Sequence, residues 1–251
     1  MVNQFVRAIG VFFILMSALS CSSSRWNHSF RKSPLSKLAG GFLIQDLATQ
    51  KVVFSLRADQ YFMPASNAKL ATFLMAKFFL GDSIPSFAYV EKKDTLFFWG
   101  TGDPTQLNPT FSNTSLIDFL HKSNKALVYC TPPKEIPPLG NGWSWDDYND
   151  GYSAEISSLP LYGNLVGFSV KSHQWEVAPR FFKSAISGTH SLNYVLRDRL
   201  KNEFSLPTLK SDFKAQQVPF VTSASLTAKL LADTLKKDVT VQRKAWDPLA
   251  K

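Results

Sequence analysis

The 251-residue sequence predicts a fold of mixed α/β class. Two short apolar runs, 41–44 and 52–55, flank the turn-forming segment 46–51, which is typical of a β-hairpin. A helix with an apolar stripe is expected to begin near Ser66 and to end before Gly81. Strand and helix patterns continue to alternate along the chain. With 45% hydrophobic residues, the chain is expected to be globular.

The rest of the chain carries further periodic segments without internal repeats or low-complexity tracts. We expect a second hairpin at 87–91 and 95–99, strands at 126–130 and 164–170, and helices at 115–122, 192–204 and 226–237. Cys130 falls in one of these strands, where the sequence predicts an inert core thiol.

The net charge of +9 does not by itself indicate nucleic acid. The lysines and arginines are scattered and no recognition motif accompanies them, so anionic envelope polymers and lipid headgroups are the expected partners instead. The four histidines show no metal-ligand spacing, and no Gly-x-Ser-x-Gly elbow is present. The sequence therefore predicts neither a metal or other cofactor nor a Ser-His-Asp triad.

The first 20 residues are predicted to be a signal peptide. Arg7 precedes an apolar run at 8–19 that is too short to span a bilayer as a helix. Ala18-Leu-Ser-Cys21 follows, and small residues before a cysteine are typical of a bacterial lipobox, so Cys21 is the predicted lipidation site. An ordinary secretory signal is the alternative. Both predict export to the cell envelope, and lipidation predicts a membrane lipoprotein that faces the periplasm.

The segment Ser66-Asn-Ala-Lys69 is the strongest candidate for a reactive site. On a helix, residues i and i+3 share one face, so the lysine can reach the serine hydroxyl. A lysine that loses its proton through burial or a cationic neighbour can then remove the serine proton. The same spacing recurs at Ser29/Lys32 and Ser211/Lys214, and we interpret both as chance.

Several further motifs accompany this segment in order along the chain. They are Phe62-Met-Pro-Ala-Ser-Asn-Ala-Lys-Leu70, Gly100-Thr-Gly-Asp-Pro-Thr105, Gly142-Trp-Ser-Trp-Asp-Asp147 with Tyr152, and Leu159-Pro-Leu-Tyr-Gly-Asn164. Together they resemble the D-alanyl-D-alanine carboxypeptidase/endopeptidase family, the class C low-molecular-mass penicillin-binding proteins, over roughly residues 38 to 237. The resemblance implies a β-lactamase/transpeptidase-like fold with an inserted subdomain.

The resemblance also implies roles for individual residues. Ser66 would be the nucleophile and Lys69 its base, while Asp147 and Tyr152 would contact the side chain of a peptidoglycan stem peptide. A structural aspartate and a half-buried tyrosine are the alternative for the last pair. Trp143 and Trp145 are expected in the core. The implied partners are peptidoglycan stem peptide, weakly bound β-lactams, and the membrane through a lipid anchor, with no nucleic acid.

Two motifs of this family, Ser-x-Asn and Lys-Thr-Gly, are not present where they are expected. Ser191-Leu-Asn193 has the right residues for the first, but it lies one predicted helix too early, so we interpret it as incidental. The segment 223–237 resembles the helix that leads into Ser-x-Asn, but Asp238-Val-Thr240 follows it. We therefore expect the C-terminal part of the fold to be missing or diverged. Two functions stay open: a serine-type D-Ala-D-Ala carboxypeptidase/endopeptidase, inactive or active in this chain, and a non-catalytic envelope lipoprotein that binds cell-wall peptide or a partner.

The expected organisation follows from these assignments. It is a signal peptide at 1–20, a lipid-anchored tether at 21–37, the N-terminal part of the transpeptidase-like domain at 38–85, the inserted subdomain at 86–190, and a truncated return to the transpeptidase-like domain at 191–251.

Overall fold

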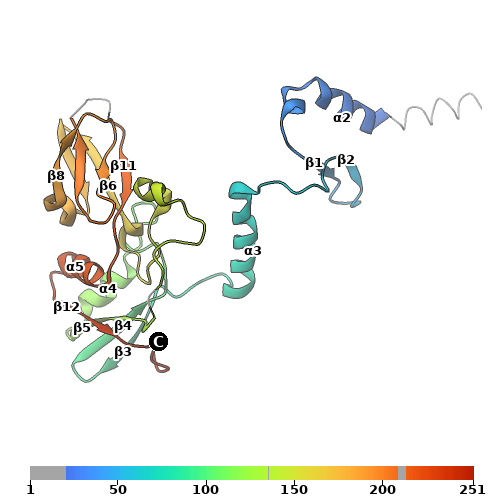
Figure 1. Ribbon diagram of the computed structural model, residues 1–251. Helices are drawn as coiled ribbons and strands as arrows, with labels where there is room; N and C mark the ends of the chain where they lie inside the picture. The colour runs from blue at the N-terminus through green and yellow to red at the C-terminus, as the bar shows by residue number, and fades with distance from the viewer. Residues whose placement is uncertain (1–20, 135, 209–212) are drawn as a thin grey trace, which may run out of the picture. The chain divides into compact units, whose positions relative to one another are not determined.

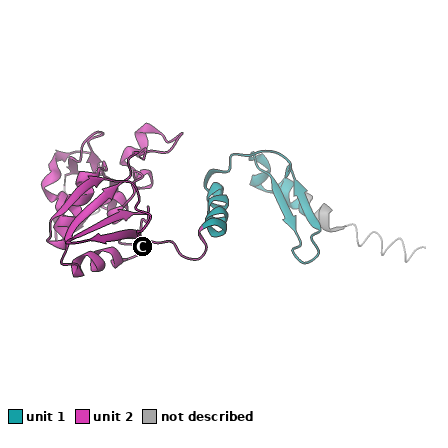
Figure 2. Cartoon of the chain, turned by 90° about the horizontal axis from the view of Figure 1, so that it is seen from below, with its two compact units in different colours: residues 1–79 teal, residues 80–251 magenta. Residues whose placement is uncertain are grey.

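The computed structural model describes residues 21–134, 136–208 and 213–251 and has the mixed helix and sheet class that the sequence predicts (Figure 1). The predicted signal peptide lies outside the described residues. The chain forms two compact units, Met1–Phe79 and Leu80–Lys251 (Figure 2). The predicted domain boundaries after residues 85 and 190 stay predictions.

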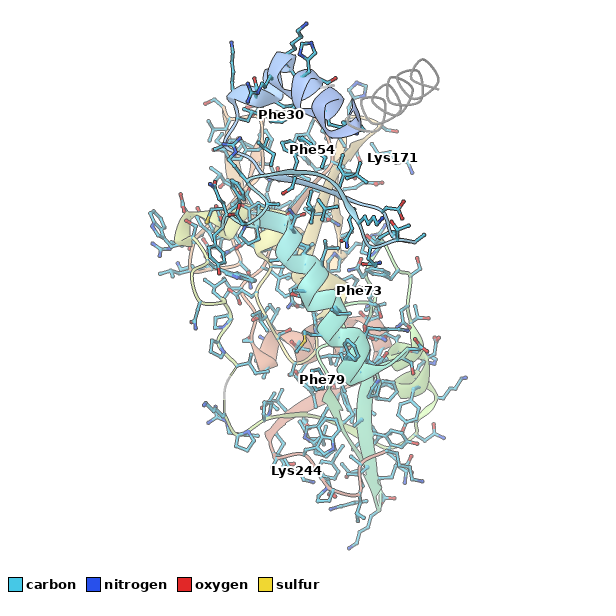
Figure 3. The ribbon with its side chains drawn as sticks, turned by 90° about the vertical axis from the view of Figure 1, so that its right-hand side faces the viewer. Phe30, Phe54, Phe73, Phe79, Lys171 and Lys244 are labelled. Carbon is cyan, nitrogen blue, oxygen red and sulfur yellow. The ribbon has the colours of Figure 1, made fainter. Side chains whose placement is uncertain are left out.

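The first unit contains the predicted hairpin, with β1 (Phe42–Gln45) antiparallel to β2 (Val52–Leu56). Residues 21–37, predicted to be a tether, form α2 (Cys21–Lys32) and the short 3₁₀ helix η1 (Pro34–Lys37). Aromatic contacts join α2 to the hairpin. Trp26 lies 6.4 Å from Phe54, and Phe30 lies 5.1 Å from Phe42, between ring centroids, so α2 packs on the hairpin (Figure 3).

Helix α3 (Ala68–Leu80) completes the first unit, after the 3₁₀ turn η2 (Ala65–Asn67). None of its residues is buried. Phe73 and Phe79 stand out from it in Figure 3 and are 70% and 77% exposed. A helix that is apolar on all sides normally lies in the core of a larger structure. The exposed apolar residues of α3 are Leu70, Phe73, Leu74, Met75, Phe78, Phe79 and Leu80.

The second unit contains a four-stranded sheet in the order β12-β5-β4-β3. Its strands are β3 (Phe87–Lys92), β4 (Thr95–Gly100), β5 (Ala126–Thr131) and β12 (Val239–Arg243). β3 and β4 form the predicted hairpin, whereas β4, β5 and β12 run parallel. Leu96 and Phe98 of β4 pack beneath α4 (Ser115–Lys122) and α5 (Ala224–Leu235), which cover one face of the sheet (Figure 1).

The C-terminal segment after β12 lies on the other face of this sheet. Trp246 stacks 6.0 Å from Trp99, and the Trp99 indole N–H donates to the Lys244 carbonyl oxygen at 3.1 Å. Lys251 exchanges two backbone hydrogen bonds with Tyr89 of β3, at 2.9 and 3.0 Å. The segment therefore crosses the sheet from the β12 edge to the β3 edge.

Two three-stranded sheets form the rest of the second unit. The first has the order β11-β6-β7 and consists of β6 (Leu165–Lys171), β7 (Gln174–Ala178) and β11 (Gln216–Pro219). The second has the order β8-β10-β9 and consists of β8 (Ile186–His190), β9 (Leu196–Arg197) and β10 (Phe204–Pro207). Phe168, Phe182, Phe204 and Phe220 pack between them, with neighbouring ring centroids 5.1–5.9 Å apart. Cys130 in β5 is 1% exposed, as predicted.

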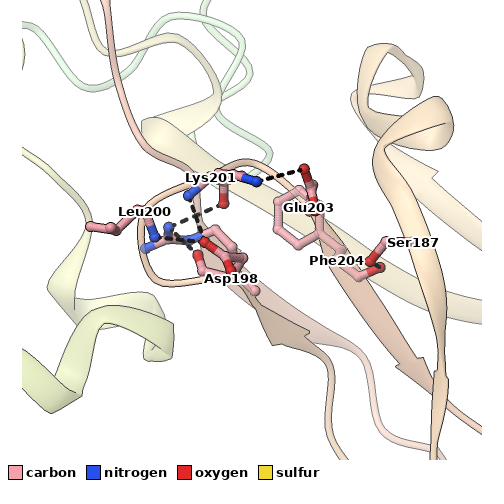
Figure 4. A network of polar contacts seen from close by, with 7 residues as sticks. Ser187, Asp198, Leu200, Lys201, Glu203 and Phe204 are labelled. Carbon is pink, nitrogen blue, oxygen red and sulfur yellow. Dashed lines mark hydrogen bonds and ion pairs between the residues drawn. The ribbon is translucent and has the colours of Figure 1, made fainter.

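The helix predicted at 192–204 is wrong. This segment forms β9, a turn and the start of β10, shown in Figure 4. The Asp198 carboxylate accepts hydrogen bonds from the backbone N–H groups of Leu200 and Lys201 at 2.9 and 3.0 Å. An aspartate that bonds the backbone two and three residues ahead favours a turn over a helix.

The segment Asp238-Val-Thr240 has a structural role. Val239 and Thr240 belong to β12, where they lie opposite Leu127 and Val128 of β5. The Thr240 hydroxyl also donates to the Leu127 carbonyl oxygen at 3.3 Å. These residues therefore hold the edge of the sheet in the second unit.

Candidate active site

Ser66 and Lys69 meet where α3 begins. Ser66 lies in the 3₁₀ turn η2, whose Asn67 backbone N–H donates to the Pro64 carbonyl oxygen at 2.9 Å. Lys69 is in the first turn of α3, and its Nζ donates to Ser66 Oγ at 3.2 Å. The sequence spacing therefore produces the serine–lysine contact that proton transfer between these groups requires.

Both side chains of this pair are exposed in the described structure. A protonated lysine cannot accept a proton, and water stabilises the charged ammonium. The geometry for proton transfer is present, but activation of Lys69 needs burial or a nearby cation. Proton transfer from Ser66 to Lys69 thus requires further groups that cover the pair and make its surroundings less polar.

Asp147 and Tyr152 lie in two consecutive 3₁₀ turns of the second unit, η3 (Trp145–Asn149) and η4 (Gly151–Ser153). Desolvation, together with hydrogen bonds to the Asp147 and Asp150 carboxylates, raises the pKa of Tyr152 to about 12. The two carboxylates thus favour the neutral phenol over the phenolate. Tyr152 is 74% exposed, which corrects the half-buried alternative.

A buried arginine from β9 holds this segment in place. Arg197 is 4% exposed, and its Nη2 donates to the Tyr148 carbonyl oxygen at 3.3 Å. Its backbone N–H donates to Asn149 Oδ1 at 2.9 Å, while Asn149 Nδ2 donates to the Val195 carbonyl oxygen at 2.9 Å. These contacts join residues nearly 50 positions apart, so no local sequence signal could have identified Arg197 as a positioning residue.

The tryptophans of this loop are not core residues. Trp143 and Trp145 are 43% and 63% exposed, which corrects the expectation that both are buried. The Arg199 guanidinium lies 4.6 Å from the Trp145 ring centre, in a cation–π contact. The loop that carries Asp147 therefore presents polar and aromatic groups to solvent.

The motif Gly100-Thr-Gly-Asp103 is a structural junction. A Cβ atom added at Gly100 would lie 2.1 Å from the Ser158 carbonyl oxygen, and the Gly102 N–H donates to that oxygen at 2.8 Å. Asp103 is 3% exposed and accepts from the Thr105 N–H at 2.9 Å. The motif thus holds the end of β4 against the segment around Ser158. Its role in the described structure is structural.

The predicted site residues are divided between the two units. Ser66 and Lys69 belong to the first unit, whereas Asp147 and Tyr152 belong to the second. Cys21 is the first residue of α2, and its lipidation stays a prediction. No helix within the described ranges 21–134, 136–208 and 213–251 is long and apolar enough to cross a membrane.

Solved structures share the fold of the chain at low sequence identity. Penicillin binding protein 4 (dacB) from Haemophilus influenzae aligns with a TM-score of 0.57 and 14% identity over 84% of this chain and 55% of that one. The same protein in complex with a novel β-lactam aligns with a TM-score of 0.50 and 13% identity over 84% and 54%. The chain thus spans about half the length of these structures. No curated protein matches it.

A family model matches the chain more directly. The model describes the D-Ala-D-Ala carboxypeptidase 3 (S13) family and matches residues 27–187, a range that includes Ser66, Lys69, Asp147 and Tyr152. This match covers more than half of the sequence and agrees with the motifs and the fold. The chain therefore belongs to the D-Ala-D-Ala carboxypeptidase 3 (S13) family.

Proposed function

We propose that this chain acts as a serine-type D-Ala-D-Ala carboxypeptidase/endopeptidase. Its substrates would be peptidoglycan stem peptides, and the reaction would pass through an acyl-enzyme on Ser66. The observation that carries the proposal is the hydrogen bond of 3.2 Å between Lys69 Nζ and Ser66 Oγ. Family membership supports the same reaction class.

In the proposed reaction, neutral Lys69 accepts the Ser66 hydroxyl proton while Oγ attacks the carbonyl carbon of the penultimate D-alanine. The peptide bond to the terminal residue then breaks, and the leaving amine takes up the proton that Lys69 accepted, which returns Lys69 to its neutral form. Water hydrolyses the resulting ester and regenerates the serine hydroxyl. The Ser66 backbone N–H would contribute to the oxyanion hole, which stabilises the developing negative charge.

Asp147 and Tyr152 supply the proposed contacts to the stem peptide. An aspartate can pair with a stem-peptide ammonium through a charge-assisted hydrogen bond. Because the pKa of Tyr152 is raised to about 12, its phenol remains a hydrogen-bond donor. The turn that carries Asp147 is held by Arg197 and Asn149, which supports a contact surface that is ordered before substrate arrives.

The reaction with a fluorescent penicillin tests the proposal. Because Ser-x-Asn is not present where the family has it and Lys-Thr-Gly does not occur in the 251 residues, we expect slow labelling. Relative to an enzyme with both motifs, the rate should fall by more than the roughly 10²–10³-fold that one lost oxyanion donor costs. Ser66→Ala and Lys69→Ala should abolish the remaining label. Ser29→Ala is the matched control, because Ser29 precedes Lys32 at the same spacing, and it should label like the wild type.

Two results would contradict this reading. Label that survives Ser66→Ala would place the acylated group elsewhere in the chain. Complete absence of label, with stem peptide still bound in a manner that depends on Asp147, would favour the non-catalytic envelope lipoprotein.

We also propose that the chain is a lipoprotein of the cell envelope, anchored through Cys21. The support is the cysteine after a short apolar run with small residues before it. The wild type should be recovered with membranes, and Cys21→Ala should move to the soluble envelope fraction. A wild type that is already soluble after signal cleavage would show that the cysteine is not lipidated.

A further inference from the structure

The outer face of the β11-β6-β7 sheet forms an open groove of about 1220 Å³ in the second unit. The three strands pair so that Gly167 lies opposite Ala178 and Gln217, and Ser169 lies opposite Glu176. Directly paired residues share one face of an antiparallel sheet. The other face carries Val166, Phe168 and Val177, which are buried in the core.

The side chains in the middle of the groove are small, so they do not fill it. Gly167, Ser169 and Ala178 form the floor, and Gly151 lines one side. A Cβ atom at Gly167 would have the Ala178 carbonyl oxygen as its nearest neighbour, at 3.7 Å, so open space lies above the floor. The groove is flat and open, and its volume exceeds the 300–1,000 Å³ that is usual for a small-molecule pocket. It therefore suits a segment of an extended chain.

Three cationic side chains line the groove. Lys171, Arg180 and Lys183 line the groove and are exposed. Within the described part of the chain, none of the three has an ion pair or a side-chain hydrogen bond, whereas lysines such as Lys92 and Lys125 are paired. Lys171, at the end of β6, is labelled in Figure 3.

Neutral polar groups and one carboxylate complete the lining. Gln174 and Gln217 offer amide donors and acceptors, and the Ser169 hydroxyl offers both, which matches the hydroxyls and amides of sugars. Glu176 lies opposite Ser169 in the middle of the face. Its negative charge repels ligands with closely spaced anions, so the ligand must carry its charges at intervals.

We propose that this groove binds an anionic polysaccharide strand in which carboxylates alternate with neutral sugars. The carboxylates would pair with Lys171, Arg180 and Lys183, and the intervening sugar hydroxyls and amides would bond to Gln174, Gln217 and Ser169. The site goes beyond the reaction proposed for Ser66, because it involves none of those residues and does not depend on acylation.

Binding of a fluorescent hyaluronan octasaccharide to the whole chain tests this site. That probe carries one carboxylate for every two sugars. We expect saturable binding that weakens as salt rises, because these contacts are exposed. The triple variant Lys171→Glu, Arg180→Glu, Lys183→Glu should lose at least tenfold in affinity. The matched triple variant Lys122→Glu, Lys134→Glu, Lys229→Glu changes the net charge equally at exposed sites elsewhere and should lose less than twofold.

A steric variant makes the test independent of charge. Gly167→Val places a strand-compatible side chain on the floor of the groove, and should also weaken binding at least tenfold with an unchanged unfolding midpoint. Equal losses in the two triple variants would overturn the site in favour of bulk charge. Absence of hyaluronan binding, or tighter binding of polyglutamate or single-stranded DNA, would overturn the ligand class.

Discussion

Replacement of Arg197 by methionine is expected to destabilise the second unit and to loosen the turns that carry Asp147 and Tyr152. Arg197 Nη1 donates to the carbonyl oxygens of Asp198 at 2.7 Å, Arg199 at 3.1 Å and Lys201 at 3.4 Å. Its Nη2 adds the bond to Tyr148, and the guanidinium carbon lies 5.2 Å from the centre of the Tyr148 ring. One side chain thus closes the β9–β10 turn and attaches η3 to it.

The magnitude follows from the quality of these bonds. The bonds to Asp198 and Arg199 are within normal length, whereas those to Lys201 and Tyr148 are at 3.4 and 3.3 Å and are weak. Two good charged bonds at roughly 1.5–3 kcal/mol each give about 3–6 kcal/mol before desolvation. Burial lowers the pKa of Arg197, so desolvation opposes the charge. The Nε atom has no partner within the described residues. We expect a net loss of about 3 kcal/mol.

Urea unfolding followed by circular dichroism measures this loss. Arg199→Met is the matched control, because the Arg199 side chain is exposed and its guanidinium lies over the Trp145 ring; it should cost less than about 1 kcal/mol. Arg197→Lys keeps the charge without the planar fork and should fall between the two. An Arg197→Met variant as stable as the wild type would refute the reasoning. It would show that the carbonyl groups bonded by Arg197 lose nothing when the guanidinium donor is removed.

Three further predictions follow from single residues. Gly100→Ala should destabilise the second unit by at least about 2 kcal/mol in thermal unfolding, because its Cβ would overlap the Ser158 carbonyl, whereas Gly188→Ala has open space and should be neutral or stabilising. Burial raises the pKa of Cys130 to about 11, so its thiolate is scarce at pH 8. In the Cys21→Ala variant, where Cys130 is the one remaining thiol, the native protein should therefore react with a thiol reagent far more slowly than the urea-unfolded protein. The ultraviolet difference between wild type and Tyr152→Phe should show a phenol that ionises near pH 12; ionisation near pH 10 would contradict the carboxylate contacts.

Sequence periodicity predicted the elements whose signals are local. The hairpin from Phe87 to Trp99 and the helix from Ser115 to Lys122 match β3, β4 and α4 closely. It failed where tertiary contacts decide. The apolar spacing around Val195 and Leu200 resembles a helix, but the Asp198 turn and the Arg197 bonds to backbone carbonyls hold the segment as strand and turn. β7 and β11 were missed because their outer residues, such as Gln174 and Gln217, give no apolar run.

In the candidate site too, the sequence predicted the local contacts and missed those that depend on the fold. Ser66 and Lys69 are three residues apart, so helix geometry alone predicts their contact. The placement of Asp147 depends on Arg197 and Asn149, whose bonds join distant parts of the sequence. A motif can therefore indicate the residues of such a loop, but only the fold shows what holds them.

The reactivity of Ser66 is coupled to the apolar surface of α3. Lys69, the proposed base, lies in the first turn of this helix beside Ser66. The same helix carries Phe73, Phe78 and Phe79, each at least 70% exposed, and burial of these rings is strongly favourable. Polypeptide that covers α3 would gain this burial and, at the first turn, would exclude water from Lys69. A cover for α3 would thus also change the surroundings of Ser66 and Lys69, and slow acylation is the expected behaviour wherever α3 stays uncovered.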